Sequence, residues 1–232
     1  MRLCSEAKFF GLLGMPQIFQ PRSNSLARLI LITVALVVIG FGWGLHAVYW
    51  SPYSTRVNVP VEQPVPFSHE HHAGGLGIDC RYCHTSVETS AFAGMPATET
   101  CMTCHSQLWT DAPMLAPVRQ SLASGKPIQW RRVHDLPGFV YFNHSIHVNK
   151  GIGCSSCHGR VDKMPLTWQA NTLYMKWCLD CHKEPEKFIR PRSEVFDMAW
   201  AAPPEQKKQG SKLVANYHVR SAQLRDCSMC HR

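Results

Sequence analysis

The chain of 232 residues is long enough for one or two domains, and 45% of its side chains are hydrophobic. Much of this apolar content is concentrated in one run near the N-terminus, which excludes a fold in which all of it packs into a single core. The formal net charge is +8, so charge by itself leaves a nucleic-acid partner open.

The apolar run covers residues 29–49, LILITVALVVIGFGWGLHAVY, and contains no charged side chain. As a helix it would span about 31 Å, which is close to the hydrocarbon thickness of a bilayer. Arg22 and Arg28 precede the run and aromatic residues gather at its far end, a pattern that predicts a cytoplasmic segment over 1–28. A cleaved signal peptide would have a shorter apolar region followed by small residues. We therefore expect an uncleaved transmembrane anchor, with everything after Trp50 outside the cytoplasm.

Residues 50–66 carry four prolines and predict an extended linker rather than a helix. The exported domain, residues 67–232, holds ten of the eleven cysteines. The eleventh, Cys4, precedes the anchor, and we expect it to be a free thiol in a reducing cytoplasm.

The ten exported cysteines fall in five CxxCH motifs, which we number in chain order. This is the attachment pattern of c-type haem, in which each cysteine forms a thioether with one vinyl group and the histidine becomes the proximal iron ligand. The motifs are motif 1 (Cys80, Cys83, His84), motif 2 (Cys101, Cys104, His105), motif 3 (Cys154, Cys157, His158), motif 4 (Cys178, Cys181, His182) and motif 5 (Cys227, Cys230, His231).

Zinc binding is the competing interpretation of these cysteines. The separations of motifs 1 and 2, and of motifs 3 and 4, lie within the range of four-cysteine zinc sites. Zinc does not require a histidine after every pair, however, and motif 5 has no partner pair left. A thioredoxin-like CxxC would not recur five times with the same following residue. The motifs therefore predict five covalently attached haem c groups.

A second strong axial ligand closes a haem iron to small molecules and restricts it to electron transfer. A repeated stretch supplies candidates, FSHEHHAGGLGIDCRYCH at 67–84 and FNHSIHVNKGIGCSSCH at 142–158, each with a His-x-x-His pair ahead of its motif. We expect the first histidine of each pair to ligate the haem of its own motif and the second to reach another haem. These predicted distal ligands are His69 at motif 1, His144 at motif 3, and His72 and His147 at other haems.

The remaining distal positions have several candidates. His134 and His218 are available, the latter shortly before motif 5. Met164 or Met175 is an alternative over the haem of motif 4, where a thioether would raise its potential, although methionines in such a stretch more often fill a core. His71 is expected to be solvated rather than ligating.

Five haems within residues 67–232 leave little protein for an independent core. We predict a multihaem cytochrome c fold that is mostly irregular, with short α-helices packed around the haems and little or no β-sheet. Because each haem adds two propionates that arginines can pair with, nucleic-acid binding is not expected. Repeat units are predicted near 67–105 and 142–182 with a C-terminal haem unit near 203–232, and helices after Cys101, at 115–123 and at 204–217.

The motifs favour an electron-transfer relay without substrate chemistry of its own, since no CxxCK variant marks an open catalytic haem. The alternative is a short membrane-anchored multihaem quinol dehydrogenase that oxidises quinol itself near the anchor, where His46 would lie. A single helix offers little pocket for a quinol, so the relay is the leading hypothesis.

Over residues 15–232 the chain resembles the pentahaem cytochrome c subunit of alternative complex III, a bacterial quinol-oxidising respiratory complex. Its most specific parts are FSHEHH with GIDCRYCHTSVE, AFAGMPATETCMTCHSQLWT, WRRVHDLPGFVYFNHSIHVNKGIGCSSCHGRVDKMP, MKWCLDCH and CSMCHR. Residues 1–14 have no counterpart in that pattern, so Met15 is a candidate for the true start.

The resemblance implies a single-pass protein of the bacterial cytoplasmic membrane, with its haem domain on the periplasmic side. It also implies partners: an iron–sulfur subunit related to molybdoenzymes, polytopic membrane subunits that oxidise quinol, and a monohaem cytochrome c subunit. In that setting the chain would take electrons from the iron–sulfur subunit and pass them to a cytochrome c or a terminal oxidase.

Overall fold

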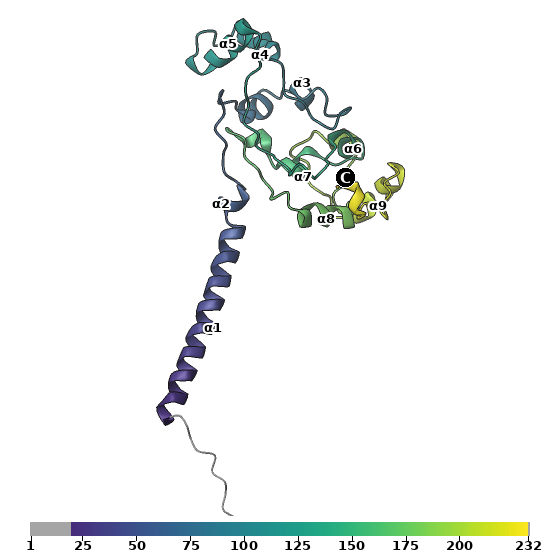
Figure 1. The fold of residues 1–232 in the computed structure, drawn as a ribbon. Helices are drawn as coiled ribbons and strands as arrows, with labels where there is room; N and C mark the ends of the chain where they lie inside the picture. Colours follow the sequence, from purple (N-terminus) through teal and green to yellow (C-terminus); the bar gives the residue numbers. More distant parts are fainter. Residues whose placement is uncertain (1–19, 232) are drawn as a thin grey trace, which may run out of the picture. The chain divides into compact units, whose positions relative to one another are not determined.

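The structure, a computed structural model, describes residues 20–231, and the chain divides into two compact units between Ser51 and Pro52 (Figure 1). The expectations for Cys4 and for a start at Met15 lie outside the described residues. Each unit is described by itself below.

The first unit contains one helix, α1 (Pro21–Trp50), which begins upstream of the predicted run because Pro21 supplies a favourable first-turn residue. Ser51 ends the helix, where its backbone N–H and its hydroxyl both donate to the carbonyl of Val48, at 3.2 and 2.7 Å. Pro52 then prevents continuation. The helix is long and apolar enough to cross a membrane, a property that membrane anchors share with signal sequences.

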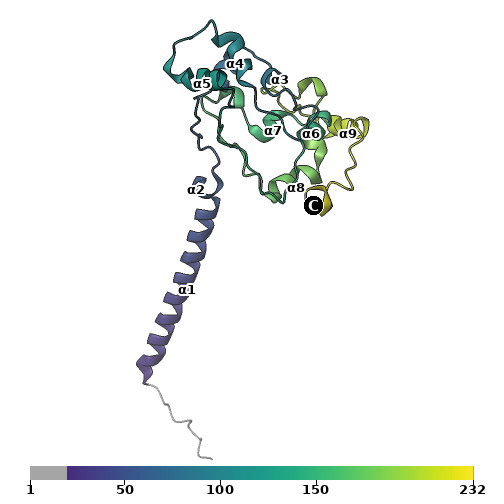
Figure 2. The same ribbon diagram turned by 45° about the horizontal axis from the view of Figure 1, so that its top comes forward.

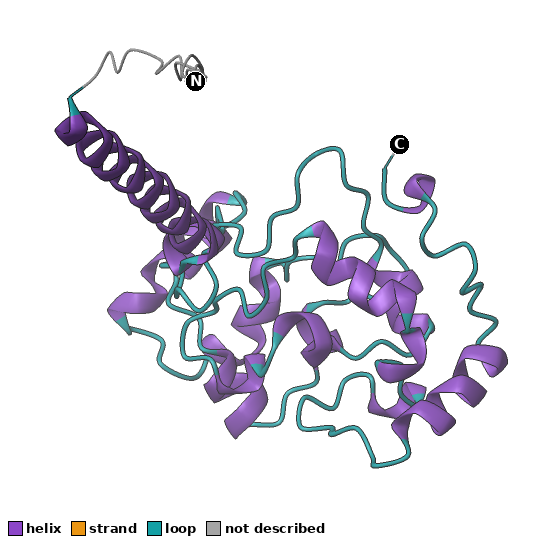
Figure 3. Cartoon of the chain, turned by 90° about the horizontal axis from the view of Figure 1, so that it is seen from below, coloured by secondary structure: helices purple, strands orange, loops and turns teal. Residues whose placement is uncertain are grey.

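The second unit consists of short helices joined by irregular chain, and Figure 3 shows no strand in the described part of it. Backbone pairing there is limited to isolated bridges such as Ile152 with Ile189. The prediction of short helices without a sheet is confirmed. The elements are α2 (Pro52–Thr55), η1 (Glu70–Gly75), α3 (Cys80–Cys83), α4 (Thr98–His105), η2 (Pro113–Leu115), α5 (Ala116–Ser124), α6 (His144–Asn149), α7 (Cys154–His158), η3 (Val161–Lys163), α8 (Met175–Lys183), η4 (Pro185–Lys187), η5 (Arg192–Glu194), α9 (Gln206–Asn216) and η6 (Cys227–Met229).

Two of the predicted helices agree closely with α5 and α9. The helix expected after Cys101 was placed too late, since α4 starts at Thr98 and contains all of motif 2. The linker prediction was also incomplete. One helical turn, α2, precedes the extended part, which then pairs with residues 167–169 through the hydrogen bonds Asn58 N to Gln169 O (2.8 Å) and Val61 N to Thr167 O (3.1 Å).

The apolar core of the second unit is small and divided. One cluster joins Val65, Leu115 and Val118, and another joins Val87, Val148 and Val195. Figures 1 and 2 show that α4 and α5 lie at one end of this unit and that α8 and the C-terminal turn lie at the other. A domain with so few buried apolar side chains needs a further source of packing, which covalent cofactors can supply.

In the second unit, α9 packs against η4. Gln206 on α9 donates its side-chain amide to the carbonyls of Glu186 (3.0 Å) and Ile189 (2.7 Å). One turn later, Gly210 is buried, and a Cβ at this position would overlap the backbone of Glu186. The glycine is therefore required by the close approach.

Replacing Gly210 by alanine is expected to lower the free energy of unfolding by roughly 1–3 kcal/mol, the usual cost of overpacking. The sign is opposite to intrinsic helix propensity, which favours alanine over glycine by about 1 kcal/mol. Chemical denaturation of the haem-loaded protein measures the effect. Ser211→Ala on the exposed side of α9 is the matched control and should stay within about 0.5 kcal/mol of the parent. Equal or greater stability of Gly210→Ala would contradict the overlap.

Candidate haem-binding site

Every CxxCH motif coincides with a helical turn, namely α3, α4, α7, α8 and η6. Cysteines three residues apart project from the same side of such a turn, which suits two bonds to one planar group. None of these ten cysteines forms a disulfide. The adjacent histidine follows on or just after the same turn, so each motif presents two sulfur atoms and one imidazole together.

The motifs differ in burial. Burial, followed by the charges of neighbouring thiols, raises the pKa of Cys157 to about 12, and burial is also the main cause that raises the pKa of Cys154 to about 11. Cys104 in motif 2 and Cys227 in motif 5 are exposed. Motif 3 is therefore the interior member of the set.

Neighbouring thiols also give the spatial order of the motifs. The pKa of Cys83 is raised first by burial and then by the nearby Cys101, which places motif 1 beside motif 2. In the same way, Cys80 helps to raise the pKa of Cys154, which places motif 1 beside motif 3. Cys181 and Cys178 of motif 4 help to raise the pKa of Cys157. Cys230 of motif 5 helps to raise the pKa of Cys178, so motif 4 lies between motifs 3 and 5. The motifs follow one another in space in the order 2, 1, 3, 4, 5.

Four of the five motif histidines are held in the same way. The ring atom Nδ1 of each lies within hydrogen-bond distance of a backbone carbonyl oxygen, which fixes a tautomer whose Nε2 lone pair is free for a metal. The pairs are His84 with Gly94 (2.7 Å), His105 with Leu108 (3.1 Å), His182 with Leu224 (2.9 Å) and His231 with Phe139 (3.1 Å). His158 is the exception.

Three further imidazoles face motif histidines at one common separation. A metal ion bonded to two imidazoles at about 2 Å each holds their ring centres about 6 Å apart, since each centre lies about 1 Å beyond its nitrogen. Burial, as first cause, lowers the pKa of His158 to about 3, so that its ring is neutral and able to ligate. The observed pairs are His72 with His105 (6.2 Å), His144 with His158 (6.3 Å) and His147 with His182 (6.2 Å).

The two His-x-x-His stretches are built alike. In the first, the ring of Phe67 stacks on His72 at 4.3 Å, and His72 Nδ1 lies 2.8 Å from the Ser68 carbonyl oxygen. In the second, Phe142 stacks on His147 at 4.5 Å, and His147 Nδ1 lies 2.7 Å from the Asn143 carbonyl oxygen. Each stretch thus positions its second histidine through the aromatic residue at its start. The phenylalanine that begins both repeated stretches in the sequence was the signal that could have indicated this positioning role.

The first histidine of each stretch also has a defined partner. His144 Nδ1 lies 2.8 Å from the Ala91 carbonyl oxygen, and His69 Nδ1 lies 3.0 Å from the hydroxyl oxygen of Thr167. Burial, followed by the charges of His84 and His72, lowers the pKa of His69 to about 4. His69 is therefore a neutral imidazole close to motif 1.

The other predicted ligands lie in different surroundings. His134 lies beside motif 3, with its Nε2 3.3 Å from His158 Nδ1, on the edge of that ring opposite the Nε2 atom that would bind iron. His218 is exposed and has a positive φ of 52°. Met164 is buried, whereas Met175 at the start of α8 is 61% exposed. His71 is exposed, in agreement with the expectation that it is solvated.

Arg190 places a buried cation against motif 3. Its guanidinium donates to the hydroxyls of Ser155 (3.2 Å) and Ser156 (3.1 Å) and lies over the ring of Trp200 at 4.2 Å. Its Nε atom is buried and has no hydrogen-bond partner among the described residues. A haem propionate is a suitable acceptor for such a group, so this surrounding fits a porphyrin.

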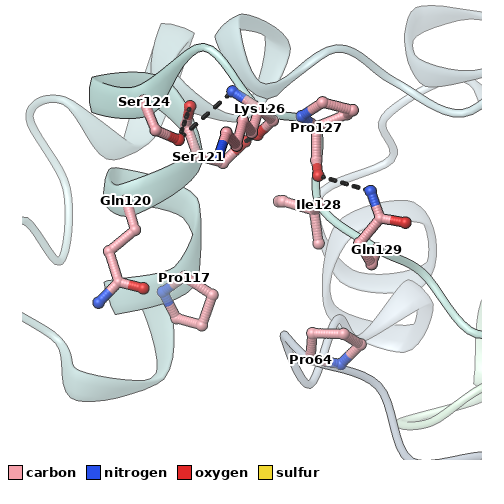
Figure 4. A pocket seen from close by; sticks show the side chains of 9 residues that line it. All are labelled: Pro64, Pro117, Gln120, Ser121, Ser124, Lys126, Pro127, Ile128 and Gln129. Carbon is pink, nitrogen blue, oxygen red and sulfur yellow. Dashed lines mark hydrogen bonds between the residues drawn. The ribbon is translucent and has the colours of Figure 1, made fainter.

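In the described part of the chain, no three histidine, cysteine or acidic side chains gather as a metal cluster. A surface pocket beside α5, formed by prolines and polar side chains of residues 117–129 with Pro64, contains no motif residue (Figure 4). The candidate haem sites are therefore defined by the motifs and the facing histidines rather than by that pocket.

Comparison with known proteins supports this chemistry. The family described as cytochrome c7 and related cytochrome c matches residues 140–232, which contain motifs 3 to 5, and the class III cytochrome c family matches residues 50–121, which contain motifs 1 and 2. The chain is 35% identical over 128 residues to the menaquinone reductase multihaem cytochrome c subunit of Nitratidesulfovibrio vulgaris. That match covers 55% of each chain, so about half the length of this relative is spanned.

Paired cysteines with an adjacent imidazole, histidine pairs at iron-bridging separations and two family matches over different parts of the chain agree with one another. Residues 50–121 and 140–232 are therefore similar to the class III and c7 cytochromes, families in which haem c is covalently bound.

Proposed function

We propose that this chain is a membrane-anchored pentahaem cytochrome c that relays electrons within a quinone-linked respiratory complex and transforms no substrate itself. The observation that carries the proposal is the set of histidine pairs at 6.2–6.3 Å, because bis-histidine ligation leaves no open coordination position. Haem c bound at the motifs supplies a one-electron Fe(III)/Fe(II) couple.

The proximal ligands in this proposal are the five motif histidines, and the ten cysteines form the thioethers. The distal ligands are then distributed by the two His-x-x-His stretches, each of which serves two neighbouring motifs. We assign His69 to motif 1 and His72 to motif 2 from the first stretch, and His144 to motif 3 and His147 to motif 4 from the second. His134 and His218 are left as candidates for motif 5, because no histidine ring faces His231 in the described chain.

The order of the motifs in space makes the relay linear. Electrons that enter at motif 2 would pass motifs 1, 3 and 4 before leaving at motif 5, or travel the same line in reverse. The exposed cysteines, Cys104 and Cys227, lie in the two terminal motifs, while the cysteines of motif 3 are partly buried and lie in the middle. Exchange with partner proteins is therefore expected at the ends.

The resemblance to alternative complex III supports a specific setting. In it, α1 anchors the chain in the cytoplasmic membrane with the haem domain on the periplasmic side. The partners are an iron–sulfur subunit related to molybdoenzymes, polytopic quinol-oxidising subunits and a monohaem cytochrome c. Electrons then move from quinol to a cytochrome c or a terminal oxidase.

The relative from Nitratidesulfovibrio favours a second candidate, since its name describes a menaquinone reductase. The same line of motifs would then deliver electrons toward menaquinone. A third arrangement, in which the isolated chain oxidises quinol beside α1, requires a quinol pocket from a single helix and is the weakest of the three.

Two measurements test the relay. The intact mass of the mature chain should contain five haem increments. Electron paramagnetic resonance of the oxidised protein should show low-spin haems of two kinds, because the imidazole planes make angles of 9° and 25° at motifs 3 and 4 but 63° at motif 2. Near-parallel planes separate the iron dπ orbitals and give rhombic signals, whereas steeply crossed planes give strongly anisotropic ones. A high-spin haem that binds cyanide or nitrite at motifs 1 to 4 would overturn the proposal.

The direction of electron transfer, from quinol or toward menaquinone, is tested separately in the purified complex. Rapid haem reduction by a quinol analogue supports quinol oxidation, and rapid haem oxidation by a menaquinone analogue supports the reductase direction. Haem reduction by quinol in the isolated chain, without partners, would instead favour the quinol dehydrogenase.

A further inference from the structure

Arg190 is a buried cation that forms no ion pair with any residue that the structure describes. The residue is 4% exposed. Its guanidinium donates only to uncharged oxygen atoms, namely the hydroxyls of Ser155 (3.2 Å) and Ser156 (3.1 Å) and the backbone carbonyls of Glu194 (3.4 Å) and Asp197 (3.2 Å). An arginine keeps its charge even when it is buried. A positive charge therefore lies inside this unit without a carboxylate bound to it.

The guanidinium lies directly against the segment that attaches the haem of motif 3. Ser155 and Ser156 are the two residues between the cysteines of this motif, so the cation contacts both of them. A Cβ built on Gly153, the residue before the motif, would overlap the guanidinium carbon. Thioether bonds would join the haem edge to Cys154 and Cys157. The charge is therefore within one residue of both attachment points.

Further contacts hold this cation in place. The guanidinium carbon of Arg190 lies 4.2 Å from the centre of the Trp200 ring. The backbone N–H of Arg190 donates to the Gly151 carbonyl at 2.8 Å, and the preceding residue, Ile189, pairs with Ile152 in an isolated bridge. Both the head and the backbone of the arginine are thus tied to the chain around motif 3, so the charge acts from a fixed position.

The cations at motifs 1 and 4 are arranged differently. Arg81, inside motif 1, is exposed and pairs with Asp79 at 2.8 Å. Lys176, on the helix of motif 4, is exposed and pairs with Asp180 at 2.8 Å. Water and the paired carboxylate screen both of these charges, whereas a buried charge is screened much less. Motif 3 is therefore under a positive field that these surface cations do not exert on their own motifs.

We propose that Arg190 raises the reduction potential of the motif 3 haem through its buried positive charge. Such a charge favours Fe(II) over Fe(III), because the reduced state carries one more electron. A unit charge that acts over about 10 Å at an effective dielectric constant of about 20 changes an equilibrium constant roughly tenfold. A propionate that accepts from the buried Nε would not reverse the sign, since the propionate belongs to the haem in every variant.

This inference rests on the proposed function, since it takes motif 3 as the middle of the relay. A raised potential at the middle position would draw an electron inward from either neighbouring motif. The haem of motif 3 would then be the place where electrons collect between the two ends of the line.

The test is a charge series in the full, haem-loaded chain. Arg190→Gln and Arg190→Met remove the charge, and the glutamine keeps an amide donor for the serine hydroxyls. Arg190→Lys keeps the charge, and titration at pH 6 keeps that lysine protonated. Optical redox titration should show the motif 3 potential falling by about 59 mV in both neutral variants, which corresponds to a tenfold change for a one-electron couple. The lysine variant should stay closer to the parent than either of them.

The motif 3 step is identified as the one that rises in His144→Met, because a methionine ligand raises a haem potential. Arg192→Met is the matched control, since Arg192 is an exposed arginine two residues along the same segment. It should shift the motif 3 potential far less than Arg190→Met, because water screens its charge.

A purely structural role for Arg190 predicts that the lysine and the neutral variants shift alike, and a bystander predicts no shift at all. Either result overturns the inference. If only one neutral variant keeps the motif 3 haem, that variant decides. Loss of this haem from both neutral variants would show that the arginine serves haem attachment rather than the potential, which also overturns the inference. A missing haem increment or a high-spin haem at motif 3 in the parent protein would instead refute the proposed function.

Discussion

Replacing Cys154 and Cys157 by serine is expected to cut the relay in two. Motif 3 lies between motif 1 and motif 4, with Cys80 near Cys154 on one side and Cys181 near Cys157 on the other. Electron tunnelling falls steeply with distance, so loss of the middle haem should slow transfer across the gap by orders of magnitude. After one rapid mixing of the complex with quinol, only two of the four remaining haems should be reduced promptly.

The control for this prediction is the pair Cys227→Ser and Cys230→Ser, which removes the terminal haem at motif 5. The same four-haem mass is expected, but all four remaining haems stay connected and should be reduced together. Prompt reduction of all four haems in the motif 3 variant would contradict the linear order. The intact mass and the low-spin spectrum of each variant verify that the other haems are attached and ligated.

The same chain made without haem attachment is expected to lack a stable second unit. The buried apolar residues of that unit form small separate clusters, and its helices are mostly one or two turns long, too short to persist alone. Circular dichroism should lose most helical signal beyond that of α1, and backbone amides after Pro52 should exchange with solvent nearly as fast as those of an unfolded chain.

The haem-loaded chain in the same detergent is the control, and it should unfold in one cooperative thermal transition. A cooperative transition in the haem-free chain would show that the protein core suffices without cofactors. That result would mean that the sparse core does not depend on packing against haem.

Much of the molecule follows from short-range pattern. The apolar run at 29–49 predicts α1 because a long uncharged segment has few alternatives to a helix, although the upstream start at Pro21 depends on a first-turn preference that hydropathy does not reveal. The CxxCH spacing predicts the haem chemistry because thioether attachment requires two cysteines and a histidine within one turn. The repeated aromatic-x-His-x-x-His stretch predicted histidines that ligate haem iron. The stacking of Phe67 and Phe142 on the second histidine of each stretch appeared only in the structure.

Chemistry and sequence order alone therefore determine what the chain after α1 can bind: ten thiols, five adjacent imidazoles and two further histidine pairs lie within fixed local spacings. Tertiary structure decided which imidazole faces which, the spatial order 2, 1, 3, 4, 5 of the motifs, and the position of His134 beside His158 of motif 3. The reason is physical. The spacing within a CxxCH motif is fixed by the covalent chain over one helical turn. Contacts between distant segments depend on the path of the intervening loops, which no sequence periodicity predicts.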